Sequence, residues 1–355
     1  MLKNRRAKLE RFFSSYGLDA ILFTSTHNIR YLCGFSGSEG ALLLTREAGW
    51  FLCDSRYTTQ AFAEVEGVDI RQFTVKLDAV ADLIEEMNFS RIGFEAARTT
   101  VADFRLLSAK LSNSELVAIE GEVDQIRSCK DSDELDQLQE VASLASNSLL
   151  AVLPLLKTGV SELDFARELE FEMRRRGAEG RAFDFIVASG ERGAMPHGRA
   201  SEKLILSGEL VTIDFGAVRH GYYSDETVTV AVGQPNDRCR EIYGIVKEAH
   251  DRAIAAVRPG ITCRELDTIA REFIRECGYG DFFGHGLGHG VGLEIHEKPV
   301  VSPRSETIVE KGMVFTIEPG IYIPGFGGVR IEDTVVVTSN GCYSLTQVSK
   351  ELMTL

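Results

Sequence analysis

The chain has 355 residues, of which 44% are hydrophobic and 26% are charged, and its formal net charge is −14 at pH 7. This length predicts about two domains, and the composition is typical of a globular protein. The acidic balance disfavours nucleic acids and anionic membranes as partners, because both attract basic surfaces. We expect no signal peptide and no run of membrane-spanning length. Seven cysteines without Cys-x-x-Cys spacing favour reduced thiols in a cytoplasmic protein.

Residues 1–124 alternate short apolar strands with helical stretches, which predicts a small α/β domain. This part of the chain contains no phosphate loop and no dinucleotide-binding fingerprint. We expect strands at residues 20–24, 41–45, 50–54, 91–95 and 115–119. We expect helices at residues 3–16, 57–66, 78–87 and 101–111.

A second domain is expected over residues 125–355. It should begin with a long helix over 132–156 whose last turn is frayed by Pro154. A segment beginning at Gly159, GVSELDFAREL, is repeated at Gly260 as GITCRELDTIAREF. Both copies are typical of a helix start after a glycine turn, and Thr262 with Glu265 forms a capping-box pattern. The repeat predicts two related halves.

Each half also contains a hairpin that carries two carboxylates. Asp214 and Asp225 belong to the first hairpin, and Glu318 and Glu332 follow 104 and 107 residues later. If the first turn consists of residues 219 and 220, Asp214 faces Asp225 directly. Such a pair repels unless a cation lies between the two carboxylates. A single acidic residue in a strand is usually solvated, but four within apolar runs indicate a cation site.

A glycine-rich segment, FGHGLGHGVGLEIHE, brings three of the seven histidines within twelve residues: His285, His289 and His296. The glycines permit close approach of the backbone to a ligand. The alternative is a surface loop whose histidines are incidental. Carboxylates together with an imidazole are ligands that suit Mn²⁺, Co²⁺ or Fe²⁺. They suit a structural zinc less well, because such a zinc is typically bound by thiolates.

These motifs resemble one known family. TIDFGA, YYSDETVTVAVG, GHGLGHGVGLEIHE, TIEPGIYIPGFGGVRIED and ASGERGAMPHGRAS are similar to the proline-specific branch of the pita-bread metallopeptidases, the Xaa-Pro aminopeptidases and Xaa-Pro dipeptidases (prolidases). YLCGFSGSEGALLLT and FLCDSRYTTQA resemble a creatinase-type N-terminal domain. The resemblance implies an α/β N-terminal domain followed by an α+β pita-bread catalytic domain with an internal pseudo-two-fold repeat.

The resemblance also implies roles for individual residues. Two divalent ions would be held by Asp214, Asp225, His289, Glu318 and Glu332. Mn²⁺ is the expected metal, and Co²⁺, Zn²⁺ or Fe²⁺ are the alternatives. Of these ligands, Asp225 and Glu332 would bridge the two ions. The implied catalytic residues are His197, His296 and Glu318, and the implied substrate-binding residues are His197, His285 and Arg330. The resemblance implies that the ligand is His289 rather than His285, because the family's ligand histidine precedes another histidine by seven residues.

The expected function is therefore a cytoplasmic, metal-dependent exopeptidase that hydrolyses the N-terminal Xaa-Pro bond of short peptides. Dipeptidase and aminopeptidase preferences both stay open. One alternative is a methionyl-type aminopeptidase, which shares the ligands but commonly lacks this N-terminal domain. Another is a catalytically inactive peptide-binding module on the same fold. We also expect a homodimer in which an exposed loop over residues 31–40, centred on Phe35, narrows the partner's active site.

Overall fold

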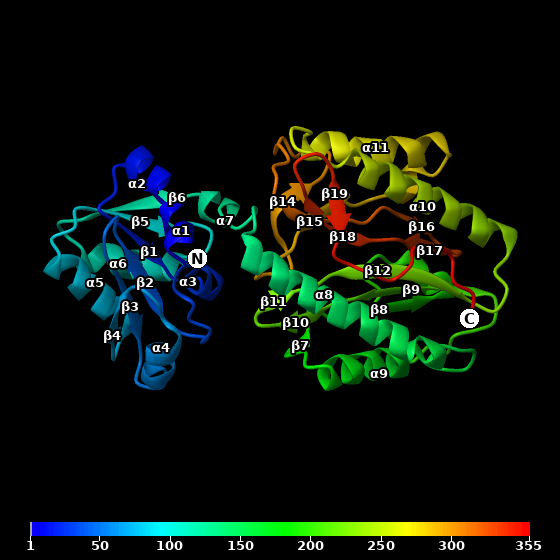
Figure 1. Ribbon diagram of the computed structural model, residues 1–355, viewed down its shortest axis with the longest axis horizontal. Helices are drawn as coiled ribbons and strands as arrows, with labels where there is room; N and C mark the ends of the chain where they lie inside the picture. Colours follow the sequence, from blue (N-terminus) through cyan, green and yellow to red (C-terminus); the bar gives the residue numbers. More distant parts are fainter. Residues whose placement is uncertain (1) are drawn as a thin grey trace. The chain divides into compact units, whose positions relative to one another are not determined.

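The computed structural model describes residues 2–355 (Figure 1). Contacts within the chain separate two compact units, one ending at Arg127 and the other beginning at Ser128.

The N-terminal unit is built on one mixed six-stranded sheet, in the order β4-β3-β2-β1-β5-β6. Its strands are β1 Ala20–Phe23, β2 Ala41–Leu44, β3 Gly49–Cys53, β4 Asp69–Gln72, β5 Arg91–Glu95 and β6 Glu115–Ile119. Its helices are α1 Leu2–Ala7, α2 Glu10–Tyr16, α3 Thr26–Cys33, α4 Thr58–Glu64, α5 Lys76–Glu86, α6 Val101–Lys110 and α7 Glu122–Gln125. Strand β1 pairs with β2 in antiparallel and with β5 in parallel orientation, and its four residues are all buried.

The five strands and the last three helices predicted for this unit are present, but the first predicted helix is divided, and α3, β4 and α7 were not predicted. The helix expected over residues 3–16 is divided into α1 and α2. Strand β4 was missed because its sequence, DIRQ, is polar and at least partly exposed at the sheet edge. Helix α3 was missed as well, and it ends at Gly34, whose φ of 88° suits glycine.

Phe35 is not exposed, contrary to the prediction. Its side chain is 1% exposed and packs against Phe51, with the ring centroids 4.5 Å apart, and edge-on against Tyr57. This phenylalanine therefore contributes to the core of its own unit.

The C-terminal unit holds its strands between two helix pairs, α8 with α9 and α10 with α11 (Figure 1). The helices are α8 Ser132–Val152, α9 Glu162–Arg175, α10 Asp237–Ala256 and α11 Cys263–Glu276, with 3₁₀ turns η1 Leu153–Leu155, η2 Gly190–Ala194 and η3 Gly280–Phe282. The strands are β7 Gly180–Arg181, β8 Ile186–Ser189, β9 Glu209–Phe215, β10 Ala217–Arg219, β11 Tyr222–Tyr223, β12 Glu226–Val232, β13 Gly288–Gly290, β14 Glu297–Val301, β15 Val314–Ile317, β16 Gly320–Ile323, β17 Gly327–Arg330, β18 Asp333–Val337 and β19 Cys342–Ser344. The main sheets have the orders β12-β9-β8 and β14-β13-β15-β18-β19, and smaller sheets pair β11-β10-β7 and β16-β17.

The repeated sequence forms two equivalent helices, α9 and α11, each of 14 residues. The hydroxyl of Ser161 caps α9, and Thr262 with Glu265 forms a complete capping box at the start of α11. Both helices end before a glycine with positive φ, 98° at Gly177 and 87° at Gly278. The predicted internal repeat is confirmed.

Helix α8 ends at Val152 and continues as the 3₁₀ turn η1, which contains Pro154. This confirms the predicted fraying. By length and apolar composition alone, Ser132–Leu155 could cross a membrane, which the sequence reading did not anticipate. However, 56% of its most apolar window is buried inside the unit, as is usual for a core helix.

The register of the first carboxylate hairpin differs from the prediction. The turn consists of His220 and Gly221, with φ values of 49° and 67°, because a two-residue turn of this kind needs positive φ at both positions and glycine adopts it readily. Asp214 consequently pairs with Thr227, and Asp225 is its diagonal neighbour. In the second hairpin, the pairs on either side place Glu318 directly across from Glu332.

Candidate metal centre

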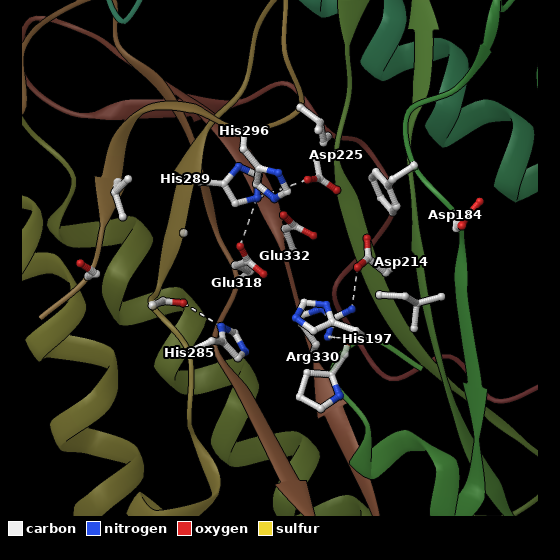
Figure 2. Close-up of a pocket in the computed structure, with 18 of the residues that line it drawn as sticks. Asp184, His197, Asp214, Asp225, His285, His289, His296, Glu318, Arg330 and Glu332 are labelled. Carbon is white, nitrogen blue, oxygen red and sulfur yellow. Dashed lines mark hydrogen bonds and ion pairs between the residues drawn. The ribbon is translucent and has the colours of Figure 1, made fainter. Parts of the chain in front are cut away.

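A pocket of about 520 Å³ lies within the C-terminal unit. It is lined by all nine residues singled out in the sequence: His197, Asp214, Asp225, His285, His289, His296, Glu318, Arg330 and Glu332. Figure 2 shows Asp225, His289, Glu318 and Glu332 pointing toward one another. The fold thus gathers side chains that are more than 130 residues apart in the sequence.

The tightest group in the pocket consists of Asp225, His289 and Glu332. One potential ligand atom from each residue lies within 4.8 Å of the others. Nε2 of His289 is 3.5 Å from Oδ2 of Asp225 and also 3.5 Å from Oε1 of Glu318. Oxygen and imidazole donors at these separations fit a small divalent cation.

Two carboxylate oxygens support the same fit. Oδ1 of Asp214 and Oε1 of Glu332 are buried and have no hydrogen-bond partner among the described residues. The second oxygen of each group is satisfied: Arg330 Nη2 lies 2.6 Å from Oδ2 of Asp214, and the Thr227 hydroxyl donates to Oε2 of Glu332 over 2.6 Å. Leaving a buried acceptor unsatisfied is costly, so a bound cation accounts for both oxygens.

The buried carboxylates of the pocket also need a nearby positive charge in order to ionise together. Burial raises the pKa of Asp225, and the neighbouring carboxylates, Glu332 first among them, raise it further. Burial likewise raises the pKa of Glu332, helped by Glu318 and Asp214. The pKa of Glu318 rises to about 8, again chiefly through burial. Acidic groups this close cannot all ionise unless a cation compensates them.

His289 is oriented for coordination through Nε2. Its Nδ1 lies 3.1 Å from the carbonyl oxygen of Gly290, and donation there leaves the Nε2 lone pair directed into the pocket. Burial lowers the pKa of His289, which favours the neutral ring that a metal requires. The ring of His296 packs edge-on against that of His289, with centroids 4.2 Å apart.

A hydrogen-bonded chain runs along the other wall of the pocket. Arg330 Nη1 donates to the Tyr322 hydroxyl over 2.9 Å, and that hydroxyl lies 2.9 Å from Nε2 of His285. Burial lowers the pKa of His285 to about 4, so the ring is neutral and accepts from Tyr322. Sequence reasoning missed Tyr322. Its signal was the strand alternation that puts residues 318, 320 and 322 on one face.

The loop that carries His197 is held by Glu162, the first residue of α9. This buried carboxylate accepts hydrogen bonds from the backbone and hydroxyl of Ser189 and of Ser201. In the sequence, Glu162 was recognised only as part of a helix start.

Asp267, in α11, plays the corresponding part for the loop that carries His285. It accepts from the backbone N–H of Leu287 and pairs with Arg271, which donates to the carbonyl oxygen of His285 over 2.6 Å. Helix residues that sequence reasoning assigned no function therefore fix both histidine loops.

Comparison with known proteins identifies the family. Residues 136–339 match the model of Metallopeptidase family M24, and residues 5–129 match the Creatinase/Prolidase N-terminal domain. The chain belongs to metallopeptidase family M24. It is therefore a peptidase, and membership of the family implies divalent metal ions. The predicted family and the pita-bread fold class are confirmed.

Similar proteins cover nearly the whole chain. An uncharacterized peptidase of Bacillus subtilis, YqhT, is 46% identical to this chain, and the match covers 98% of this chain and 99% of the length of YqhT. The Xaa-Pro dipeptidase from Bacillus anthracis has a TM-score of 0.97 and 43% identity, covering 100% of both chains. The X-Pro aminopeptidase from Thermotoga maritima has a TM-score of 0.90 and 38% identity, covering 96% of this chain and 98% of its own.

Proposed function

We propose that this M24 peptidase removes the N-terminal residue that precedes proline in short peptides, using two divalent ions. The observation that carries the proposal is the convergence of Asp225, His289 and Glu332 within 4.8 Å in a pocket that also holds Asp214 and Glu318. Four carboxylates and one imidazole would provide enough donors for two ions, and Asp225 and Glu332 would be the ligands shared between them. Mn²⁺ is our proposed metal, because oxygen-rich sites with one histidine suit it.

When bound, such ions lower the pKa of a water molecule and polarise the carbonyl of the peptide bond. The chain's own residues would complete the reaction. Glu318 lines the same pocket as the other proposed ligands, so its carboxylate would lie close enough to accept the proton of the attacking water. His296 would donate to the developing oxyanion. His197 would supply a proton to the departing proline nitrogen, which has no N–H of its own in the substrate.

For His285 and Arg330 we propose roles in shaping the substrate pocket. Arg330 is 3% exposed, and its guanidinium donates to Asp214, Tyr322 and the carbonyl oxygen of Pro196. His285 accepts from the same tyrosine. Together they would fix Asp214 and the pocket wall against which the substrate lies.

The names of the relatives support proline specificity, since one similar structure is an Xaa-Pro dipeptidase and another an X-Pro aminopeptidase. The match of residues 5–129 to the Creatinase/Prolidase N-terminal domain favours this reading over a methionyl-type aminopeptidase. The presence of all five proposed ligands disfavours an inactive binding module.

The test is a peptide panel: Ala-Pro, Ala-Pro-Ala, Ala-Ala and Met-Ala, each with metal-loaded and chelator-treated protein. We expect cleavage of the proline peptides only, and only with metal. The ratio of Ala-Pro to Ala-Pro-Ala turnover decides between dipeptidase and aminopeptidase. Preferential cleavage of Met-Ala would support the methionyl-type alternative and contradict the proposal.

We further propose a cytoplasmic homodimer. No disulfide joins the cysteines of the described residues, in keeping with a reducing compartment. Any contribution of residues 31–40 to a partner's active site must come from residues other than the buried Phe35. Light scattering during gel filtration should give twice the chain mass of 39.2 kDa, whereas a peak at the single-chain mass would contradict the dimer.

A further inference from the structure

A buried lysine near the C-terminus lies behind the candidate metal centre. Lys350 is 8% exposed in its side chain, and its Nζ lies 2.6 Å from Oε1 of Glu226 and 3.4 Å from Oδ1 of Asp333. Burial alone would lower the pKa of Lys350, but the two carboxylates outweigh it and raise that pKa, so the lysine is charged.

The two acids that Lys350 contacts occupy equivalent places in the two halves of the repeat. Glu226 directly follows Asp225, and Asp333 directly follows Glu332. Because successive side chains of a strand point to opposite faces, each acid faces away from the pocket while the preceding residue faces into it. One lysine therefore reaches behind both proposed bridging ligands.

Other contacts hold the same two strands together. The backbone N–H of Glu332 donates to the carbonyl oxygen of Thr227, and the hydroxyl of Thr334 donates to the carbonyl oxygen of Asp225 over 2.8 Å. Lys350 adds a charged link on the opposite face. Its own position is fixed in turn, because its carbonyl oxygen accepts from the Tyr243 hydroxyl over 2.9 Å.

The surrounding C-terminal segment is anchored to the same strand. Val348 N–H donates to Oε1 of Glu226, and the Ser146 hydroxyl donates to its other oxygen. Further along, Met353 and Leu355 exchange backbone hydrogen bonds with Ala231 of β12. The red C-terminal end of the ribbon accordingly runs back to the sheet (Figure 1).

We propose that Lys350 is a positioning residue for the metal centre: through Glu226 and Asp333 it fixes the separation of the strands that carry Asp225 and Glu332. This inference rests on the proposed metal site. Its consequence is that the C-terminal segment determines how tightly the ions are held, although it contributes no ligand. Replacing a residue that orients metal ligands typically lowers the metal affinity about 10–100-fold.

The test is titration of metal-free protein with Co²⁺, followed by its visible absorption bands and by competition with a chelator. Lys350→Met should weaken binding about 10–100-fold and alter the bands. Lys350→Arg, which keeps the charge, should retain most of the affinity. The matched control is Lys247→Met, because Lys247 pairs with Asp251 and Glu351 but with neither acid behind the ligands. This control should bind Co²⁺ as the natural chain does.

A double variant separates positioning from stability. Lys350→Met with Glu226→Gln leaves no unpaired charge at Glu226, so it should melt at a higher temperature than Lys350→Met alone and still bind Co²⁺ weakly. If the single variant fails to fold, the Co²⁺ titration is carried out on the double variant instead. Normal affinity in the single or the double variant, or an equal loss in Lys247→Met, would overturn the inference. Failure of the unaltered chain to bind Co²⁺ would instead refute the metal site itself.

Discussion

Without bound metal, this peptidase should lose folding stability as the pH rises from 7 to 8. In the metal-free protein, burial holds the pKa of Glu318 at about 8, against a usual value of 4.5. Between these values the folded protein keeps a proton that the unfolded chain has released. The free energy of unfolding then falls by up to about 1.4 kcal/mol per pH unit for each such proton. For Glu318 alone, this amounts to about 1 kcal/mol between pH 7 and 8.

The pH range matters because His285 acts in the opposite direction. Burial lowers the pKa of His285 to about 4, so this group adds stability as the pH rises toward the unfolded value of 6.5. That gain is nearly complete at pH 7. The pKa values of Asp225 and Glu332 are raised, so these carboxylates add to the loss caused by Glu318.

Urea unfolding with excess chelator at pH 7.0 and 8.0, followed by circular dichroism, measures this effect. Glu318→Gln is the control, because glutamine has nearly the same shape and does not titrate. Its unfolding free energy should fall by about 1 kcal/mol less than that of the natural chain over the same interval. Saturating Mn²⁺ should reverse the trend, because metal binding requires ionised carboxylates. An identical pH dependence in the two chains would refute the account of Glu318.

Three further outcomes follow from the placement of single residues. Asp225→Asn should abolish both metal binding and turnover, whereas His220→Ala, in the exposed hairpin turn, should leave both unchanged. A fully active Asp225→Asn protein with two bound ions would contradict the ligand assignment. His296→Ala should lower turnover about 10²–10³-fold with normal metal content, and loss of metal in this variant would mean that the roles of His289 and His296 are exchanged. Phe35→Ala should destabilise the N-terminal unit by about 3–5 kcal/mol, as measured by the fluorescence of Trp50 in urea; a shift below about 1 kcal/mol would show that Phe35 is not a core residue.

The repeat and the carboxylate motifs were readable from the sequence because they depend on local patterns. Capping at Thr262 requires only a hydroxyl and a glutamate three residues later. The apolar runs around Asp214 and Glu318 mark buried strands wherever they occur. These signals pointed to the four carboxylates and the histidine cluster, whereas His197 and Arg330 were implied only by the family resemblance.

The register of the first hairpin was not readable in the same way. It depends on which two residues adopt positive φ, and both 219–220 and 220–221 were possible turns around His220. The structure selects 220–221, where Gly221 takes one of the two left-handed positions. The resulting shift moves Asp225 from a position opposite Asp214 to a diagonal one.

Contacts between distant segments were also beyond the sequence. Lys350 lies 124 residues after Glu226, and nothing in its local pattern distinguishes it from an exposed lysine. Tyr322 was equally inconspicuous until Arg330 and His285 were seen on either side of it. Such roles arise from tertiary packing, which only the folded chain reveals.

We propose that the activity of the peptidase depends on two ions held by one set of five side chains. The most direct test measures metal content and Ala-Pro-Ala turnover on the same samples as metal-free protein is reloaded with Mn²⁺. We predict that turnover is absent without metal and reaches its maximum as the content approaches two ions per chain. Full turnover in chelator-treated protein with no detectable metal would show that the activity does not depend on these ions.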